Sequence, residues 1–82
     1  MALVVNLEPA AQGRNTVHAP LWRCTYKDFL DPAGGTIFQI SSYGQEGREN
    51  EQSISQSIQL REETARALIQ HLKDAFPTLA DA

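Results

Sequence analysis

The sequence predicts an α+β domain in which three or four antiparallel strands form a curved sheet and one C-terminal helix packs on it. Three observations support this fold class. Apolar and polar residues alternate in residues 21–30, 36–43 and 53–60. A turn signature, DPAGG, separates the first two of these segments. In residues 62–76 the apolar spacing changes to three and four, the period of an amphipathic helix.

The first twenty residues predict a strand followed by a loosely held segment. Apolar residues alternate through ALVVNLE, as in a short strand. Residues 9–20, PAAQGRNTVHAP, have a proline at each end and a glycine inside, which is typical of a loop. The 82 residues make a single domain. We divide it into this lead-in, residues 1–20, and a sheet-plus-helix part, residues 21–82.

Residues 21–43 predict a hairpin. Its first strand, LWRCTYKDFL, is rich in aromatic residues; one face carries Trp22, Cys24 and Tyr26, and the other carries Arg23, Thr25 and Lys27. In the turn, Asp31 can cap the backbone, Pro32 fixes φ, and the two glycines accept positive φ. The returning strand, TIFQISSY, has Ile37, Gln39, Ser41 and Tyr43 on one side and Phe38, Ile40 and Ser42 on the other.

The next two segments predict a solvated loop and a strand. Residues 44–52, GQEGRENEQ, contain two glycines and no apolar residue, which is typical of a loop. In SISQSIQL, residues 53–60, we expect Ile54, Ile58 and Leu60 to point inward together, with serines and glutamines outward. Hydroxyls and amides without charge suit either a groove that follows a nucleic-acid backbone or an ordinary hydrated sheet surface.

A helix is expected from about Glu62 to Phe76. Its apolar stripe consists of Ala65, Leu68, Ile69, Leu72 and Phe76. Burying four large side chains contributes roughly 6–12 kcal/mol gross. Ordering entropy offsets most of this gain, so the helix should exist only while it is docked on the sheet. Two glutamates in the first turn complement the helix dipole, and Pro77 ends the helix.

Charge and residue types narrow the function classes. Seven Lys and Arg against ten Asp and Glu give a net charge of −3, which counts against nucleic-acid binding. The one cysteine, Cys24, cannot form an internal disulfide, and its distance from His18 and His71 fits no metal-ligand spacing. No catalytic signature appears, so we expect neither an enzyme nor a cofactor. No apolar stretch is long enough to span a membrane, and we expect a cytoplasmic protein.

The strings WRCTYKDF, FQISSY, GQEGRENEQ and SIQL followed by REETARALIQHL carry a family resemblance. Over about residues 21–76 the chain resembles the single-stranded-DNA-binding domain of the transcriptional coactivator positive cofactor four and its bacterial relatives. The strings FQ, YG and SQSIQL are also similar to ones in small uncharacterised bacterial proteins. The resemblance implies a homodimer whose helices meet and whose sheets form a groove. The chain departs from the family in having few basic residues on its strands, and in Arg61, a poor helix cap.

The candidate nucleic-acid site lies on the strands and their loop. Trp22 and Tyr43 would stack on bases, unless they belong to the core, as we expect for Phe38. Phosphates would contact Arg23, Lys27 and Arg48, with neutral hydrogen bonds from Thr25 and from Ser55 or Ser57. An ordinary solvated strand face explains the same residues.

A second strip of the helix offers a contact with another copy. It consists of Thr64, Ala67, His71 and Ala75, which are small except for the histidine. Small side chains let another backbone approach closely. The alternative is a helix flank that touches the edge of its own sheet.

Two functions remain. The first is a small dimeric protein that binds single-stranded nucleic acid in transcription or DNA metabolism. The second is an acidic protein-interaction module, for example a host- or phage-encoded accessory or inhibitor protein, without nucleic-acid binding. The resemblance favours the first, and the net charge of −3 favours the second.

Overall fold

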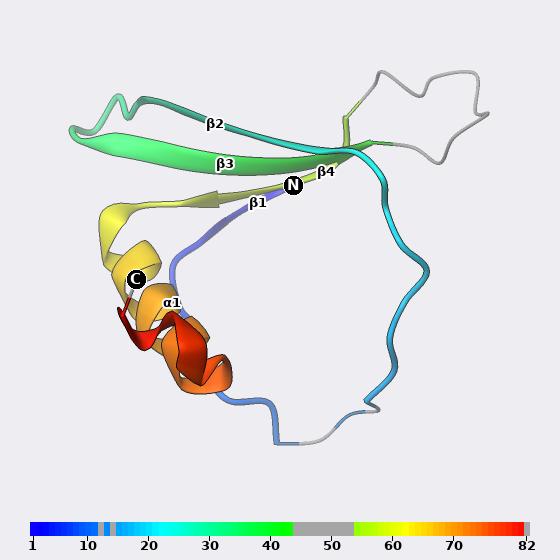
Figure 1. Ribbon diagram of the computed structural model, residues 1–82. Coiled ribbons are helices and arrows are strands. Elements are labelled where there is room, and N and C mark those ends of the chain that lie inside the picture. Colours follow the sequence, from blue (N-terminus) through cyan, green and yellow to red (C-terminus); the bar gives the residue numbers. More distant parts are fainter. Residues whose placement is uncertain (12, 14, 44–53, 82) are drawn as a thin grey trace.

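The computed structural model describes residues 1–11, 13, 15–43 and 54–81. Four strands and a C-terminal helix confirm the α+β class (Figure 1). The elements, in order, are β1 (Ala2–Val4), β2 (Cys24–Leu30), β3 (Thr36–Tyr43), β4 (Ile54–Leu60), α1 (Glu62–Ala75) and the 3-10 helix η1 (Pro77–Asp81). Residues 44–53, which include the predicted loop 44–52 with Arg48, lie outside the described residues.

The sheet has the order β1-β4-β3-β2, and it is mixed. β2 and β3 form the predicted hairpin, and β3 and β4 are also antiparallel. β1, however, pairs with β4 in parallel, so the expectation of a wholly antiparallel sheet is wrong at this edge. β1 and β2 consequently run in the same direction at opposite edges of the sheet (Figure 1).

The turn between β2 and β3 forms as its sequence predicts. Gly34 and Gly35 have φ values of 108° and 87°, which are strained for other residues. Asp31 caps the turn, because its Oδ1 accepts a hydrogen bond of 2.9 Å from the backbone N–H of Ala33. The hairpin register then follows by counting outward, from Leu30 opposite Thr36 to Cys24 opposite Ser42.

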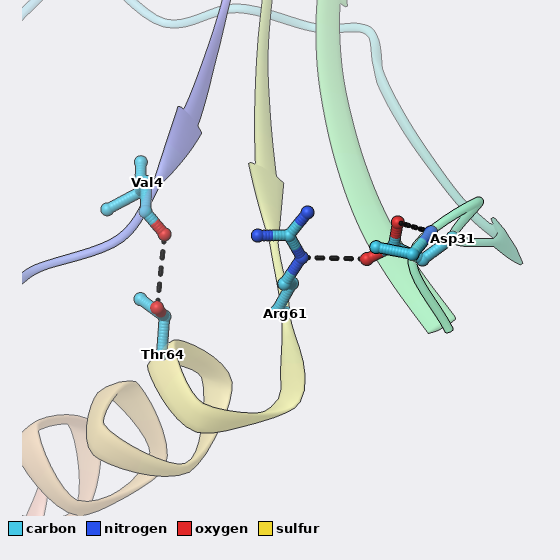
Figure 2. Close-up of polar contacts among 5 residues, drawn as sticks. Val4, Asp31, Arg61 and Thr64 are labelled. Carbon is cyan, nitrogen blue, oxygen red and sulfur yellow. Dashed lines mark hydrogen bonds and ion pairs between the residues drawn. The ribbon is translucent and has the colours of Figure 1, made fainter. Parts of the chain in front are cut away.

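α1 begins directly after β4, and contacts of its first residues fix the junction. Arg61 is the N-cap residue and makes no side-chain cap hydrogen bond, consistent with its poor capping ability. Its side chain instead reaches the β2–β3 turn, where Nε donates to Asp31 Oδ2 at 2.7 Å. One turn later, the hydroxyl of Thr64 donates to the carbonyl of Val4 at 3.0 Å (Figure 2). The start of α1 is therefore tied to both the turn and β1.

A register shift between Ser42 and Tyr43 changes which side chains of β4 share a face. Ser42 pairs with Gln56, but Tyr43 pairs with Ile54 rather than with the next residue in sequence. Ile54 therefore lies on the same face as Ser57, and both line one depression of the surface. The prediction that Ile54 points inward with Ile58 is wrong, because a bulge reverses the alternation at this point.

The two faces of the sheet have different chemistry. Paired residues and alternation along each strand define them. What we call the polar face carries Thr25, Lys27, Gln39, Ser41, Tyr43, Ser57 and Gln59, together with the apolar Leu3, Phe29, Ile37 and Ile54. What we call the apolar face carries Val4, Tyr26, Phe38, Ile40, Ile58 and Leu60, together with Ala2, Cys24, Asp28, Leu30, Thr36, Ser42 and Gln56.

The core of the single chain is small. Among the described residues, Ile37 and Leu60 are the only buried apolar side chains. Ala65 in the first full turn of α1 lines a depression with Phe38 and Leu60, which places the start of the helix on the apolar face. Beyond that turn, α1 leaves the sheet at an angle instead of crossing it (Figure 1). The helix therefore docks less extensively than its apolar stripe predicts.

Candidate nucleic-acid interface

The polar face carries the predicted phosphate-binding side chains of β2. Lys27 lies opposite Gln39, and Thr25 lies opposite Ser41. Arg23 immediately precedes β2, and its guanidinium lies 4.2 Å from the centroid of the Tyr43 ring, which places it on the same face. The structure thus brings Arg23 and Lys27 to one side of the sheet, as the alternation predicted, and the hairpin register adds Tyr43 to the same side.

Arg23 is held by an aromatic ring that is itself held in place. The hydroxyl of Tyr43 is 3.1 Å from that of Thr25, so one hydroxyl donates to the other across the hairpin. The guanidinium covers the face of the ring, a cation–π arrangement in which its planar N–H groups can still donate to an anionic ligand. Lys27 has a similar but looser neighbour, with Nζ 5.6 Å from the ring centroid of Phe29.

The middle of the polar face is an ordered network of amides and hydroxyls. Gln59 Nε2 donates to Gln39 Oε1 at 2.9 Å, and Gln39 Nε2 donates to Ser41 Oγ at 2.9 Å. Gln39, Ser41 and Ser57 are buried. No buried side-chain polar atom of the described residues lacks a hydrogen-bond partner, so this network is satisfied within the chain.

The charges of the chain are distributed unevenly. Lys27 and the adjoining Arg23 are positive, and the described residues of the polar face include no carboxylate. The described acidic residues lie elsewhere: Glu8 in the lead-in, Asp28 opposite Phe38 on the apolar side, Asp31 in the turn, and Glu62, Glu63, Asp74 and Asp81 in the helices. The described part of the polar face therefore carries two positive charges and no negative one, although the whole chain has a net charge of −3; Glu46, Glu49 and Glu51 lie outside the described residues.

The remaining predicted ligand-binding residues occupy different environments. Trp22 precedes β2 and is 86% exposed, so it does not belong to the core. Ser57 is buried on the polar face. Arg48 and the side chain of Ser55 lie outside the described part of the structure. Phe38, predicted as core, is partly exposed on the apolar face and stacks with Tyr26 at a centroid distance of 5.9 Å.

The four residues predicted to contact a second copy are not equivalent. Thr64 is buried, and its hydroxyl is occupied by the Val4 carbonyl. Ala67, His71 and Ala75 are exposed on α1. Thr64 therefore has a role inside the chain, and contact through the other three stays a prediction.

The described residues offer little for catalysis. No group of three or more His, Cys, Asp or Glu side chains among them could hold a metal ion. Among the described titratable groups the carboxyl of Asp31 has a clear shift: the hydrogen bond from Arg61 and that from the Ala33 N–H lower its pKa below its ordinary value of 3.8, against the effect of burial. A carboxyl whose pKa is lowered in this way stays ionised and holds the turn. No described helix has the length and apolarity that a membrane crossing requires.

The amide network was not predicted, although a signal for it exists in the sequence. Counting outward from the DPAGG turn places Lys27 beside Gln39, and the antiparallel pairing with β4 then places Gln39 beside Gln59. The pairing of β3 with β4 depends on the connection through residues 44–53, for which the sequence supplies no turn signature of defined length.

Comparison of the chain with protein-family models, curated proteins and solved structures found no match, so the resemblance to positive cofactor four stays a prediction.

Proposed function

We propose that the protein binds single-stranded nucleic acid along the polar face of its sheet, acting as a homodimer in the cytoplasm. One observation carries the proposal: both cations of the hairpin lie on the polar face, whose described residues contain no carboxylate. A phosphate backbone is attracted to such a surface even when the net charge of the protein is negative. The exposed thiol of Cys24 fits a reducing compartment.

The proposed contacts divide between phosphate and base. Arg23 and Lys27 bind phosphates, and the Tyr43 ring positions the Arg23 guanidinium. Trp22, which precedes β2 and is 86% exposed, stacks on a base at the β2 edge of the sheet, beside the polar face. Base stacking contributes about 1–3 kcal/mol per base and tolerates any sequence. Thr25 and Gln59 add neutral hydrogen bonds to the backbone, so the expected binding has little sequence preference.

The test is fluorescence anisotropy with a labelled single strand of about 20 nucleotides, titrated at several salt concentrations. Binding to single strands weakens with salt with a logarithmic slope of about −0.7 per phosphate contact. Arg23→Ala and Lys27→Ala should each make this slope shallower by about that amount, because each removes one contact. The single tryptophan adds a second readout, since stacking should quench its fluorescence.

The matched control is Arg66→Ala, which removes the same charge from an exposed position on α1. It should leave both the affinity and the salt slope unchanged. Absence of binding at low salt, or an equal effect of Arg66→Ala and Arg23→Ala, would contradict the proposal.

A second function, an acidic protein-interaction module, is favoured by the exposed apolar face. Tyr26 is 77% exposed and Ile58 50%, and large exposed apolar areas mark sites of protein contact. A chain that fails to bind the labelled strand, and that stays a monomer in solution, would support this function.

A further inference from the structure

Two apolar surfaces of the chain are left uncovered. On the sheet, Tyr26, Phe38, Ile40 and Ile58 of the apolar face are all exposed. On α1, the stripe that begins with the half-buried Ala65 and Leu68 continues with Ile69, 53% exposed, Leu72, and Phe76, 56% exposed. The sequence predicts that the helix stripe and the apolar face bury each other. In the part of the chain that the structure describes, they are in contact only at the start of α1.

The single chain cannot close this gap without breaking contacts. Arg61 is bound to Asp31 and Thr64 to Val4, and these two contacts set the direction in which α1 leaves β4 (Figure 2). Among the described residues, no side-chain hydrogen bond or ion pair joins a later turn of α1 to the sheet. An isolated helix of 14 residues is marginal in water, so its stripe requires a covering surface.

The exposed side chains on both surfaces are large. On the sheet, Tyr26 is 77% exposed, Ile58 50% and Ile40 42%, and on the helix Phe76 and Ile69 are each more than half exposed. Contiguous exposed apolar side chains mark sites of protein contact, and an interface of standard size takes about 800 Å² from each partner.

We infer that the occupant is a second copy of the chain, and that the helix stripe of each copy lies across the apolar face of the other. A two-fold axis makes this contact reciprocal, so one arrangement covers both surfaces of both chains and then closes. A different protein would need both a helix that covers the apolar face and an apolar surface that covers the helix stripe. This contact uses the face opposite to the polar face, and it holds whether or not nucleic acid binds.

The reciprocal arrangement differs from a contact between two helices. Ala67, His71 and Ala75 would form the centre of a helix-to-helix dimer, whereas here they lie outside the contact made by Ile69, Leu72 and Phe76. The two arrangements make opposite predictions for substitutions on the sheet, because only the reciprocal one buries Ile40 and Ile58 in the interface.

The experiment measures mass by light scattering during size-exclusion chromatography. The whole chain should elute as a dimer of 18.2 kDa, twice the 9.1 kDa of one copy. Ile69→Glu on the helix and Ile40→Lys on the sheet should each give monomers, since each places a charge in the apolar contact. Ala67→Glu, on the opposite side of α1, is the matched control and should stay dimeric.

Mixing the two monomeric variants gives the decisive result. A mixture of Ile69→Glu and Ile40→Lys chains should recover a dimer, because one of its two contacts pairs the glutamate with the lysine and the other is unchanged. Two helices in contact would give no such recovery, and Ile40→Lys alone would remain dimeric.

The mass of the wild-type chain in solution tests the inference even if a variant fails to fold. A wild-type monomer at about 100 μM would overturn it and assign the two surfaces to another protein. Disruption of the dimer by Ala67→Glu with no effect of Ile40→Lys would overturn it in favour of the helix-to-helix contact. Anisotropy with the labelled strand, measured on the same samples, reports nucleic-acid binding separately.

Discussion

Arg61 Nε donates a hydrogen bond to Asp31 Oδ2 at 2.7 Å, and this contact joins the start of the helix to the turn of the hairpin. The Asp31 side chain is only 4% exposed, whereas that of Arg61 is 47% exposed. Asp31 also accepts the Ala33 N–H, so one carboxylate organises its own turn and receives the helix (Figure 2). Arg61 is a poor N-cap residue, but its side chain has a structural role in joining the helix to the turn.

Asp31→Asn should destabilise the protein near neutral pH and have a smaller effect in acid. The folded state lowers the pKa of Asp31 below 3.8, so its ionised form is favoured by folding. The resulting stability is fully present above the unfolded pKa and is lost as pH falls through the folded pKa. Urea unfolding of the wild type and the variant should give midpoints that differ at pH 7 and converge below pH of about 4.

Glu62→Gln is the control for this pH dependence. Glu62 forms an ion pair with Arg66 at 3.6 Å, but both side chains are almost fully exposed, so the pair contributes little. Its urea midpoint should stay close to that of the wild type. A midpoint difference between Asp31→Asn and the wild type that persists unchanged into acid would show that the carboxylate charge is not what stabilises the turn.

Thr64→Val should lower the free energy of unfolding by about 1 kcal/mol, the usual contribution of one hydrogen bond. The substitution keeps the shape of the side chain but removes the hydroxyl that donates to the Val4 carbonyl at 3.0 Å. Thr64→Ser, which keeps the hydroxyl, should retain more of the stability. Hydrogen exchange of the β1 amides should accelerate in the valine variant, because the contact ties α1 to that strand. Equal stability of the valine variant and the wild type would mean that the bond is unimportant.

Tyr43→Leu should weaken binding to the labelled strand by about 2- to 5-fold, while Tyr43→Phe should have little effect. A cation–π contact at an exposed site contributes about 0.5–1 kcal/mol, and phenylalanine keeps the ring below the Arg23 guanidinium. The hydroxyl that Tyr43→Phe removes contacts Thr25 and does not hold the arginine. Anisotropy titrations of both variants check this order, and a larger loss for phenylalanine than for leucine would refute the positioning role of the ring.

Local chemistry explains why the hairpin was predictable and the parallel pairing of β1 was not. Residues 24–43 contain alternating strands and a turn whose proline and glycines specify the backbone, so pairing and register follow from neighbours in sequence. The parallel pairing of β1 with β4 joins Ala2 to Ile58, across most of the chain. No local pattern encodes the direction of such a pair, because alternation is the same in parallel and antiparallel strands.

The candidate nucleic-acid site was predictable in part for the same reason. The alternation in residues 23–27 places Arg23, Thr25 and Lys27 together, and the structure confirms that they share a face. The stack of Arg23 on Tyr43 required the register of the hairpin in three dimensions. The bulge beside Tyr43, which moves Ile54 to the polar face, breaks the alternation on which the prediction of that residue depended.

The sequence by itself determined the strands of the hairpin, the turn, the helix and its apolar stripe, because propensity and periodicity act between residues close in the chain. Only the tertiary structure decided where that stripe points. The direction of α1 follows from two hydrogen bonds, Arg61 to Asp31 and Thr64 to Val4, which join residues 30 and 60 positions apart. These bonds fix the orientation of the first turn of α1. In that orientation the helix points away from its own sheet, and the apolar side chains of its later turns do not reach the strands.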